Sequence, residues 1–185
     1  MTQIHQLSVR HDELQDRLLL RLNTPERQEF CFWLTRRMVI RLLPVLAQSV
    51  RRLEAAQPGM AAADGPSQHL LSELKRDAFL QTADFATPYA APTQPGPWGD
   101  EPLLITDAQL SLLPQGSLQI IFQKKTAGTT KSCQLNLQAP LVHGLVHLIE
   151  QCIGQADWAL ASATAKVQGL AVEPASAATA PVYKH

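Results

Sequence analysis

The amino-acid sequence predicts an α+β fold of two tandem βββα repeats, each an antiparallel meander with a packed helix, with a helical and proline-rich insert between them. The main observation is that residues 109–151 resemble residues 6–48. In both segments a period of 2 runs through three stretches and then gives way to a period near 3.6. The alternative is chance likeness between amphipathic stretches, but the shared order and period favour duplication. The matched positions are Gln6-Leu7-Ser8-Val9 with Gln109-Leu110-Ser111-Leu112, Leu18, Leu20 and Leu22 with Leu118, Ile120 and Phe122, and Phe30, Phe32 and Leu34 with Cys133, Leu135 and Leu137.

The first repeat covers residues 1–55, with strand patterns at about 3–10, 17–24 and 28–34. Thr35 is a suitable N-cap for a helix over about 36–55. Pro44 removes one internal hydrogen bond from that helix, which predicts a bend or a short break. The apolar side of the helix consists of Val39, Leu42, Leu43, Leu46, Val50 and Leu53, and the residues facing away include Arg41, Gln48, Arg51 and Arg52.

The insert covers residues 56–102: a turn-rich linker, a helix over about 67–83 and a proline-rich stretch. Five prolines within residues 86–102 exclude regular structure there. We expect the insert to lie across the helix-free face of the sheet and to cover Trp33, because its large apolar side chains need burial. The helix carries Leu70, Leu71, Leu74 and Ala78 on one side, and the apolar residues that need burial are Leu71, Phe79, Phe85 and Trp98.

The second repeat covers residues 103–158, and its helix opens with Pro140, which suits a first turn. Residues 159–185 are rich in Ala, Thr and Ser, which predicts a disordered tail. The two sets of three strands can join in one sheet or form two, and the sequence leaves both open within a single compact domain. The helix is expected to bury Leu141, Val142, Leu145, Leu148, Ile149, Cys152 and Ile153.

The charge of the chain is balanced overall but unevenly placed. Sixteen basic and sixteen acidic residues cancel, so no global field favours nucleic acid or an anionic membrane. Residues 1–55 hold nine arginines and six acids, a net of +3, whereas residues 100–158 hold three lysines and five acids, a net of −2. We therefore expect any anionic partner to bind the first half.

Localisation is predicted from what the sequence lacks. There is no basic and then apolar signal-peptide pattern, and no run approaches the roughly 18–20 apolar residues that span a bilayer. Three cysteines without a Cys-x-x-Cys pair indicate reduced thiols. The expectation is a cytoplasmic protein with no membrane partner.

One candidate site is the helix-free sheet face of the first repeat. Its outward positions include Arg10, Arg21 and Trp33. Such a face could hold an extended peptide or single-stranded nucleic acid, with Trp33 stacking on a base and Arg21 near a phosphate. The competing expectation is that the insert covers this face.

A second candidate is the start of the first helix, with Arg36, Arg37 and Arg41. Arginines in a first turn oppose the helix dipole, but beside exposed backbone amides they could hold an anion or an acidic partner. The favoured alternative is a solvated face with Arg36 and Arg37 paired to Glu26 or Glu29.

His143, His147 and Glu150 share one face of the last helix and are weak candidates for a metal site. The motif of zinc proteases is absent, and the favoured interpretation is a solvated polar side. The sequence has no Gly-rich phosphate loop, no Gly-x-Ser-x-Gly motif and no cysteine placed for catalysis. We therefore expect no catalytic residues, no cofactor and no enzymatic activity.

The segments Glu29-Phe-Cys-Phe-Trp-Leu-Thr-Arg-Arg37 and Ala83-Asp-Phe-Ala-Thr-Pro-Tyr89 resemble motifs of an uncharacterised protein family encoded by proteobacteria. The resemblance covers most of residues 3–155 and implies a bacterial origin without an assigned activity. In topology only, repeated meander-plus-helix units are similar to the whirly and PUR-type binders of single-stranded nucleic acid, which use four strands per unit and are usually basic.

The function predicted from the sequence is that of a non-enzymatic interaction or scaffold protein that binds another protein or associates with itself as a homo-oligomer. The alternative is single-stranded nucleic-acid binding through Arg10, Arg21, Trp33, Arg36 and Arg37. A metal-dependent enzyme using the histidine face of the last helix is the least favoured hypothesis.

Overall fold

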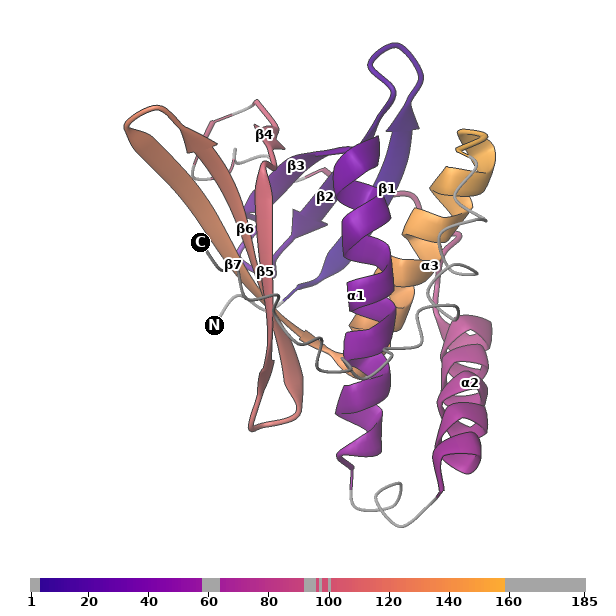
Figure 1. The fold of residues 1–185 in the computed structure, drawn as a ribbon. Coiled ribbons are helices and arrows are strands. Elements are labelled where there is room, and N and C mark those ends of the chain that lie inside the picture. The colour runs from indigo at the N-terminus through magenta and orange to yellow at the C-terminus, as the bar shows by residue number, and fades with distance from the viewer. Residues whose placement is uncertain (1–3, 58–63, 92–95, 97, 100, 159–185) are drawn as a thin grey trace, which may run out of the picture.

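The computed structural model describes residues 4–57, 64–91, 96, 98–99 and 101–158 and shows two βββα units in tandem (Figure 1). This arrangement confirms the predicted α+β repeat. The prediction for residues 159–185 lies outside the described residues. The first unit comprises β1 (Gln6–Asp12), β2 (Arg17–Asn23), β3 (Glu29–Thr35) and α1 (Arg36–Ala55); α2 (Gly65–Thr82) and β4 (Leu103–Leu104) follow; the second unit comprises β5 (Asp107–Leu113), β6 (Ser117–Thr126), β7 (Thr129–Gln138) and α3 (Ala139–Gln155).

The strands form two separate hydrogen-bonded sheets, with the orders β1-β2-β3-β4 and β5-β6-β7. All pairings are antiparallel except that of β3 with β4. The chain passes directly from one sheet to the other at residues 105 and 106. The Ile105 amide donates to the Trp33 carbonyl of the first sheet at 3.0 Å, and the Thr106 amide donates to the Gln123 carbonyl of the second sheet at 2.9 Å. This connection settles the question that the sequence left open in favour of two sheets.

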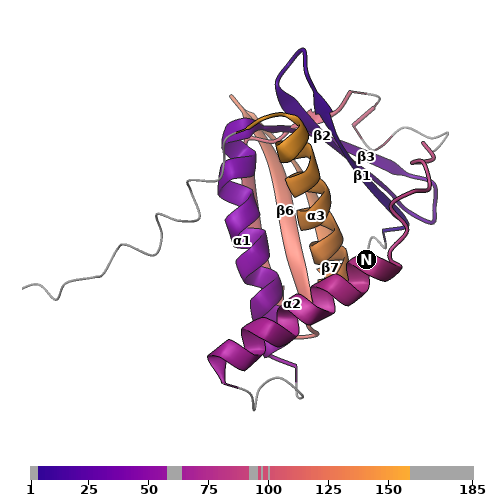
Figure 2. The ribbon, with the colours of Figure 1, turned by 90° about the vertical axis from the view of Figure 1, so that its right-hand side faces the viewer.

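The two sheets and two of the helices share one hydrophobic core. The rings of Phe32 in β3 and Phe122 in β6 meet with centroids 5.2 Å apart. Helices α1 and α3 lie side by side over the apolar faces (Figure 2). Helix α1 contacts β3 of its own repeat and also β5 and β6, while α3 contacts β6, β7 and also β1. Each helix therefore packs on the sheet of the other repeat as well, which holds both units in one domain.

Local sequence explains where the helices begin. The Thr35 hydroxyl accepts a hydrogen bond from the Met38 amide at 3.2 Å, which confirms the predicted cap of α1. Pro140 lies in the first turn of α3, as predicted. The prediction of a break at Pro44 is wrong, since α1 runs through this residue without interruption. Pro44 lies on the exposed side, where water can solvate the Ile40 carbonyl that loses its helical partner.

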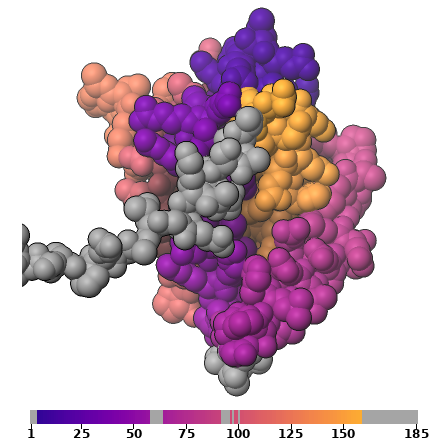
Figure 3. Space-filling model, turned by 45° about the vertical axis from the view of Figure 1, so that its right-hand side comes forward, coloured from indigo at the N-terminus to yellow at the C-terminus, as the bar shows by residue number. Residues whose placement is uncertain are grey.

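Helix α2 packs with the side opposite to the one expected. Asp64 caps it by accepting from the Ser67 amide at 2.9 Å, so the helix starts two residues earlier than predicted. Leu70 and Leu74 are 58% and 56% exposed, and Ser72 is the buried residue of the helix. The expected burial of the insert is thus wrong for Leu71 and Phe85 as well, both of which are exposed. Helix α2 lies at the surface of the molecule, against α1 and α3 (Figure 3).

Helix α3 is buried on more of its surface than predicted. The expected apolar positions Val142, Leu145, Ile149 and Cys152 are buried, and Leu141, Leu148 and Ile153 are partly buried against the core. His143, Gly144 and Val146 are also buried. The reason is that α2 lies against this side of α3, with the Phe79 ring close enough to Gly144 to touch a side chain placed there.

Two further properties concern the whole described chain. None of its helices combines the length and the apolar character needed to cross a membrane. Cys31, Cys133 and Cys152 are free thiols, as the sequence predicted. Burial raises the pKa of Cys133 to about 12, so this thiol stays protonated.

Candidate functional site

The solvent-exposed side of α1 carries four arginines, Arg37, Arg41, Arg51 and Arg52, which we call the arginine face. With a rise of 1.5 Å per residue, it extends over about 22 Å. Among the residues that the structure describes, none of the four guanidinium groups has a hydrogen-bond or ion-pair partner. Arg51 also lines a pocket with Glu73 and Glu150, whereas Arg37, Arg41 and Arg52 present positive charge to the solvent without an ionic partner among the described residues.

Apolar side chains lie between these arginines. Ile40 is 37% exposed and Val45 is 42% exposed, and Pro44 is exposed beside them. The single acidic residue of α1, Glu54, is buried and does not reach this side. The arginine face thus combines positive charge with modest apolar patches, a composition that suits an acidic and partly apolar partner.

Arg36 differs from its neighbours because it has local partners. Its guanidinium lies 5.9 Å from the centre of the Trp158 ring, and the Trp158 indole donates to Asp16 at 2.6 Å. This hydrogen bond and the nearby charge of Arg36 hold the pKa of Asp16 below its ordinary value. The Trp158–Asp16 hydrogen bond joins the segment after α3 to the β1–β2 turn, and Arg36 lies beside it. The expected pairing of Arg36 and Arg37 with Glu26 or Glu29 is wrong.

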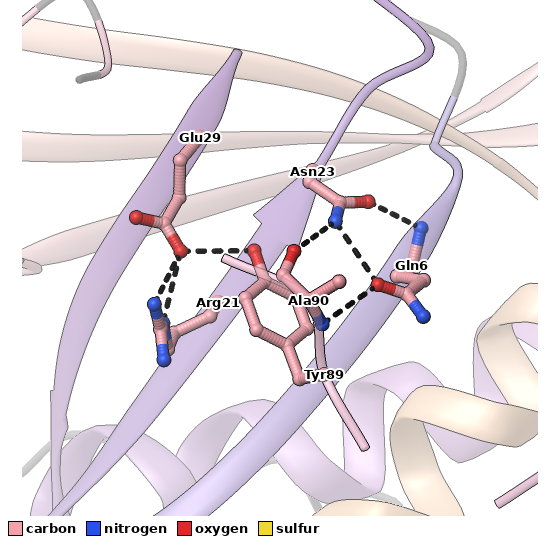
Figure 4. A network of polar contacts seen from close by, with 6 residues as sticks. All are labelled: Gln6, Arg21, Asn23, Glu29, Tyr89 and Ala90. Carbon is pink, nitrogen blue, oxygen red and sulfur yellow. Dashed lines mark hydrogen bonds and ion pairs between the residues drawn. The ribbon is translucent and has the colours of Figure 1, made fainter. Parts of the chain in front are cut away.

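Glu29 instead binds Arg21 on the helix-free face of the first sheet (Figure 4). The Arg21 Nε and Nη2 atoms donate to Glu29 Oε1 at 3.0 and 2.7 Å. Tyr89, from the insert, places its ring 4.5 Å from the Arg21 guanidinium carbon and donates its hydroxyl to the same Glu29 oxygen at 3.0 Å. Burial and the hydrogen bond to Glu29 both raise the pKa of Tyr89, so the phenol stays protonated.

Two side-chain amides next to this group hold the backbone of Ala90 (Figure 4). The Ala90 amide donates to Gln6 Oε1 at 3.1 Å, and Asn23 Nδ2 donates to the Ala90 carbonyl at 3.0 Å. Asn23 Nδ2 also donates to Gln6 Oε1 at 3.1 Å, and Asn23 Oδ1 accepts from the Gln6 backbone amide at 2.7 Å. Both backbone polar groups of Ala90, its amide and its carbonyl, are therefore satisfied by the sheet face.

The insert covers the helix-free face less completely than predicted. Tyr89 and Ala90 lie on it, but Trp98 packs against Phe30 and Phe32, with ring centroids 5.8 and 6.2 Å apart, which places it on the apolar side of the sheet. Trp33 is partly buried and its carbonyl accepts the Ile105 amide. On its edge of the sheet, β3 is paired by β4, with Trp33 opposite Leu104.

The predicted binding residues fall into two groups on opposite sides of the first sheet. Arg21 and Trp33 belong to the helix-free face, whereas Arg36, Arg37 and Arg41 belong to α1, which packs on the apolar face. Arg10 is exposed on the helix-free face, but Arg21 is engaged by Glu29 and Tyr89. The structure does not bring these residues together in one site.

The predicted histidine face of α3 is also divided. His143 is 5% exposed and its Nε2 lies 3.0 Å from Glu54 Oε1, so a solvated His143 is wrong. The His147 ring lies 5.0 Å from that of Phe85, and Glu150 is exposed. Over the described ranges, no three His, Cys, Asp or Glu side chains are grouped so that they could hold a metal ion.

Glu54 links three helices through buried polar contacts. Its carboxylate contacts His143 of α3, and the Ser72 hydroxyl of α2 donates to Glu54 Oε2. Burial raises the pKa of Glu54, but the hydrogen bonds from His143 and Ser72 outweigh it and leave the pKa below its ordinary value. In a catalytic triad the histidine lies between the serine and the carboxylate and takes the serine's proton. Here the carboxylate of Glu54 lies between Ser72 and His143. The trio therefore lacks the arrangement that activates a serine as a nucleophile.

A pocket of about 90 Å³ opens beside this trio between α1, α2 and α3. Arg51 and Arg76 line it together with Glu73 and Glu150. Charges of both signs therefore face the same small volume, which does not single out a class of ligand.

Sequence reasoning did not identify Gln6, Asn23, Glu54, Ser72 or Tyr89 as members of polar networks. Each of these networks joins residues far apart in the chain. The sequence features that could have pointed to them were Glu54, as the single acidic residue of α1, and Tyr89, as a tyrosine in the insert. Comparison of the chain with protein-family models, with curated proteins and with solved structures found no match.

Proposed function

We propose that this protein is a non-enzymatic interaction protein that binds an acidic segment of another protein along the arginine face of α1. The observation that supports this proposal is the exposure of Arg37, Arg41, Arg51 and Arg52 without a partner among the described residues. An arginine carries its charge at any physiological pH and binds a carboxylate through two parallel hydrogen bonds. Four such groups on one rigid helix are arranged to recognise several carboxylates of one segment.

The composition of the face favours an acidic protein over a nucleic acid. Ile40 and Val45 lie among the arginines and are partly exposed, and apolar contacts of this kind match the alternating charged and apolar residues of an acidic amphipathic helix. Base stacking would need an exposed aromatic ring beside the arginines. The ring of Trp158, which lies near the start of α1, is buried and donates a hydrogen bond to Asp16.

Electrostatic attraction over this face is expected to control the rate of association and its dependence on salt. Exposed charges that meet an opposite charge speed encounter, and the effect falls as ionic strength rises. The apolar side chains and any desolvated arginine would then determine how long the complex lasts. The proposal therefore predicts binding that weakens strongly between low and high salt.

The experiment uses the full chain as bait in a lysate of its native cells, with quantitative mass spectrometry of the captured proteins. The test variant is Arg37→Glu/Arg41→Glu, which reverses the charge of half of the arginine face. The control is Arg10→Glu/Lys131→Glu, which changes the net charge equally at two exposed residues outside α1. We expect an acidic protein that the wild type and the control recover equally and that the test variant recovers at least about tenfold less.

Two outcomes would contradict the proposal. One is equal loss of the partner in the test and control variants, which would indicate dependence on net charge alone. The other is recovery that disappears when the lysate is treated with nuclease, which would indicate that a nucleic acid binds the face. Circular dichroism and urea unfolding of both variants exclude loss of folding as the cause.

A further inference from the structure

The helix-free face of the first sheet holds a short piece of the chain's own insert. The piece is Tyr89–Ala90, and its contacts to Gln6, Arg21, Asn23 and Glu29 are those drawn in Figure 4. We call residues 84–91 the strap. The strap is exposed from Asp84 to Pro88 and again at Ala90 and Ala91, so that Tyr89 is its one partly buried residue. Recognition by the sheet is therefore concentrated on one tyrosine side chain and on the backbone amide and carbonyl of Ala90.

The chemistry of this recognition does not depend on the rest of the strap. The sheet face binds the Ala90 backbone amide and carbonyl through side-chain amides, and the Ala90 side chain makes no polar contact there. The tyrosine is bound by its ring against the Arg21 guanidinium and by its hydroxyl against Glu29. Any segment that places a tyrosine side chain and the backbone amide and carbonyl of the next residue in this way offers the same groups.

We infer that this face is a peptide-binding site that the strap occupies, and that a tyrosine-containing segment of another protein can replace the strap. Because the strap is tethered to the sheet, it competes with any other peptide at an effective concentration on the order of millimolar. Weak ligands therefore cannot displace the strap. A segment that binds more tightly than the strap, or that is locally abundant, can. This site lies on the helix-free side of the sheet, whereas α1 packs on the apolar side, so the inference is independent of the arginine face.

The carboxylate of Glu29 sets the chemistry of the tyrosine that fits. It accepts a hydrogen bond from a neutral phenol, and the anionic phosphate of a phosphotyrosine in the same place would face a like charge. The Arg21 guanidinium is already bound by Glu29 through two nitrogen atoms. The site should therefore accept tyrosine, tolerate phenylalanine poorly and exclude phosphotyrosine.

The test supplies the strap as a separate peptide. The probe is a fluorescein-labelled octapeptide with the sequence of residues 84–91, Asp-Phe-Ala-Thr-Pro-Tyr-Ala-Ala, and binding is followed by fluorescence anisotropy. The receptor is the full chain with Tyr89→Ala, which removes the competing ring, and the wild type is its comparison. We expect the peptide to bind the Tyr89→Ala chain at least about tenfold more tightly than the wild type.

Control variants distinguish the site from unspecific binding. The peptide with phenylalanine in place of its tyrosine, and the same peptide with phosphotyrosine, should each bind the Tyr89→Ala chain about tenfold more weakly or worse. Adding Arg21→Met to Tyr89→Ala should abolish binding, because methionine keeps the apolar stem and loses the guanidinium. Equal binding to wild type and Tyr89→Ala, or binding that survives Arg21→Met, would overturn the inference. Urea unfolding of each variant, and of Arg10→Glu as a matched change on the same face, shows whether the domain remains folded.

Discussion

Replacing Glu54 with alanine should destabilise the domain substantially, because its carboxylate is the shared acceptor of a buried network. Glu54 is 3% exposed and contacts both His143 and Ser72. Without it, two buried polar groups lose their partner at a cost of about 1–3 kcal/mol each. We expect the free energy of unfolding to fall by about 2–5 kcal/mol in urea titrations at pH 7, with a melting temperature lower by about 5–15 °C.

A double variant separates the network from simple packing. Glu54→Leu/His143→Leu replaces the Glu54–His143 pair with apolar side chains, an exchange that is often close to neutral for the pair itself, and it leaves only the Ser72 hydroxyl of the network without its acceptor. The double variant should therefore be more stable than Glu54→Leu alone or His143→Leu alone, with a coupling energy of about 1–3 kcal/mol between the two positions. A Glu54→Ala variant that loses less than about 1 kcal/mol, or additive effects of the two leucines, would refute the reasoning.

The same network predicts the direction of an acid effect. Because the pKa of Glu54 is lowered in the folded state, its carboxylate contributes stability that is fully present above the ordinary glutamate pKa and is lost as the pH falls through the lowered value. The difference in unfolding free energy between wild type and Glu54→Gln should thus shrink below about pH 4. A difference that stays constant down to pH 2 would show that the carboxylate charge does not matter.

Three further predictions concern packing and reactivity. The side chains of Leu46 and Leu145 are 0% and 1% exposed, so Leu46→Ala and Leu145→Ala should each lower the free energy of unfolding in urea by about 2–5 kcal/mol. Leu74→Ala, on the exposed side of α2, should change it by less than about 0.5 kcal/mol. Similar losses at all three positions would mean that α2 packs with its other side. Burial raises the pKa of Cys31 to about 11 and of Cys133 to about 12, so a disulfide reagent at pH 8 should label both slowly until urea unfolds the chain. Rapid labelling of the native protein would contradict that packing. Zinc titrated into the folded protein should find no stoichiometric site on α3, because His143 is held by Glu54, and tight one-to-one binding would contradict this.

The sequence was sufficient to predict elements whose signals are local. The Thr35 cap and the apolar positions of α1 follow from helical periodicity, and Pro140 marks the start of α3. The outward position of Arg37 and Arg41 follows from the same periodicity, which is why the arginine face could be expected in part. Arg51 and Arg52 were placed on the outward side of the helix but were not grouped with these two.

The parts that sequence reasoning missed depend on contacts between distant residues. Helix α2 turns Ser72 inward because Glu54, 18 residues away, and His143, on α3, lie beneath it, and its leucines face the solvent as a result. Periodicity alone assigns the leucine side to the core. Likewise, no local signal shows that Tyr89 reaches Glu29, which is 60 residues away.

Photo-crosslinking can show whether the arginine face of α1 contacts an acidic protein, as we propose. A photo-crosslinking amino acid placed at Gln48, an exposed position in the middle of this face, is compared in native cells with the same group at Gln134, an exposed position of β7. We expect an adduct at Gln48 to a protein whose crosslinked peptide is rich in Asp and Glu. That adduct should disappear with Arg37→Glu/Arg41→Glu and should be absent at Gln134. The same adduct from both positions, or a nucleic-acid adduct at Gln48, would show that the arginine face does not bind an acidic protein.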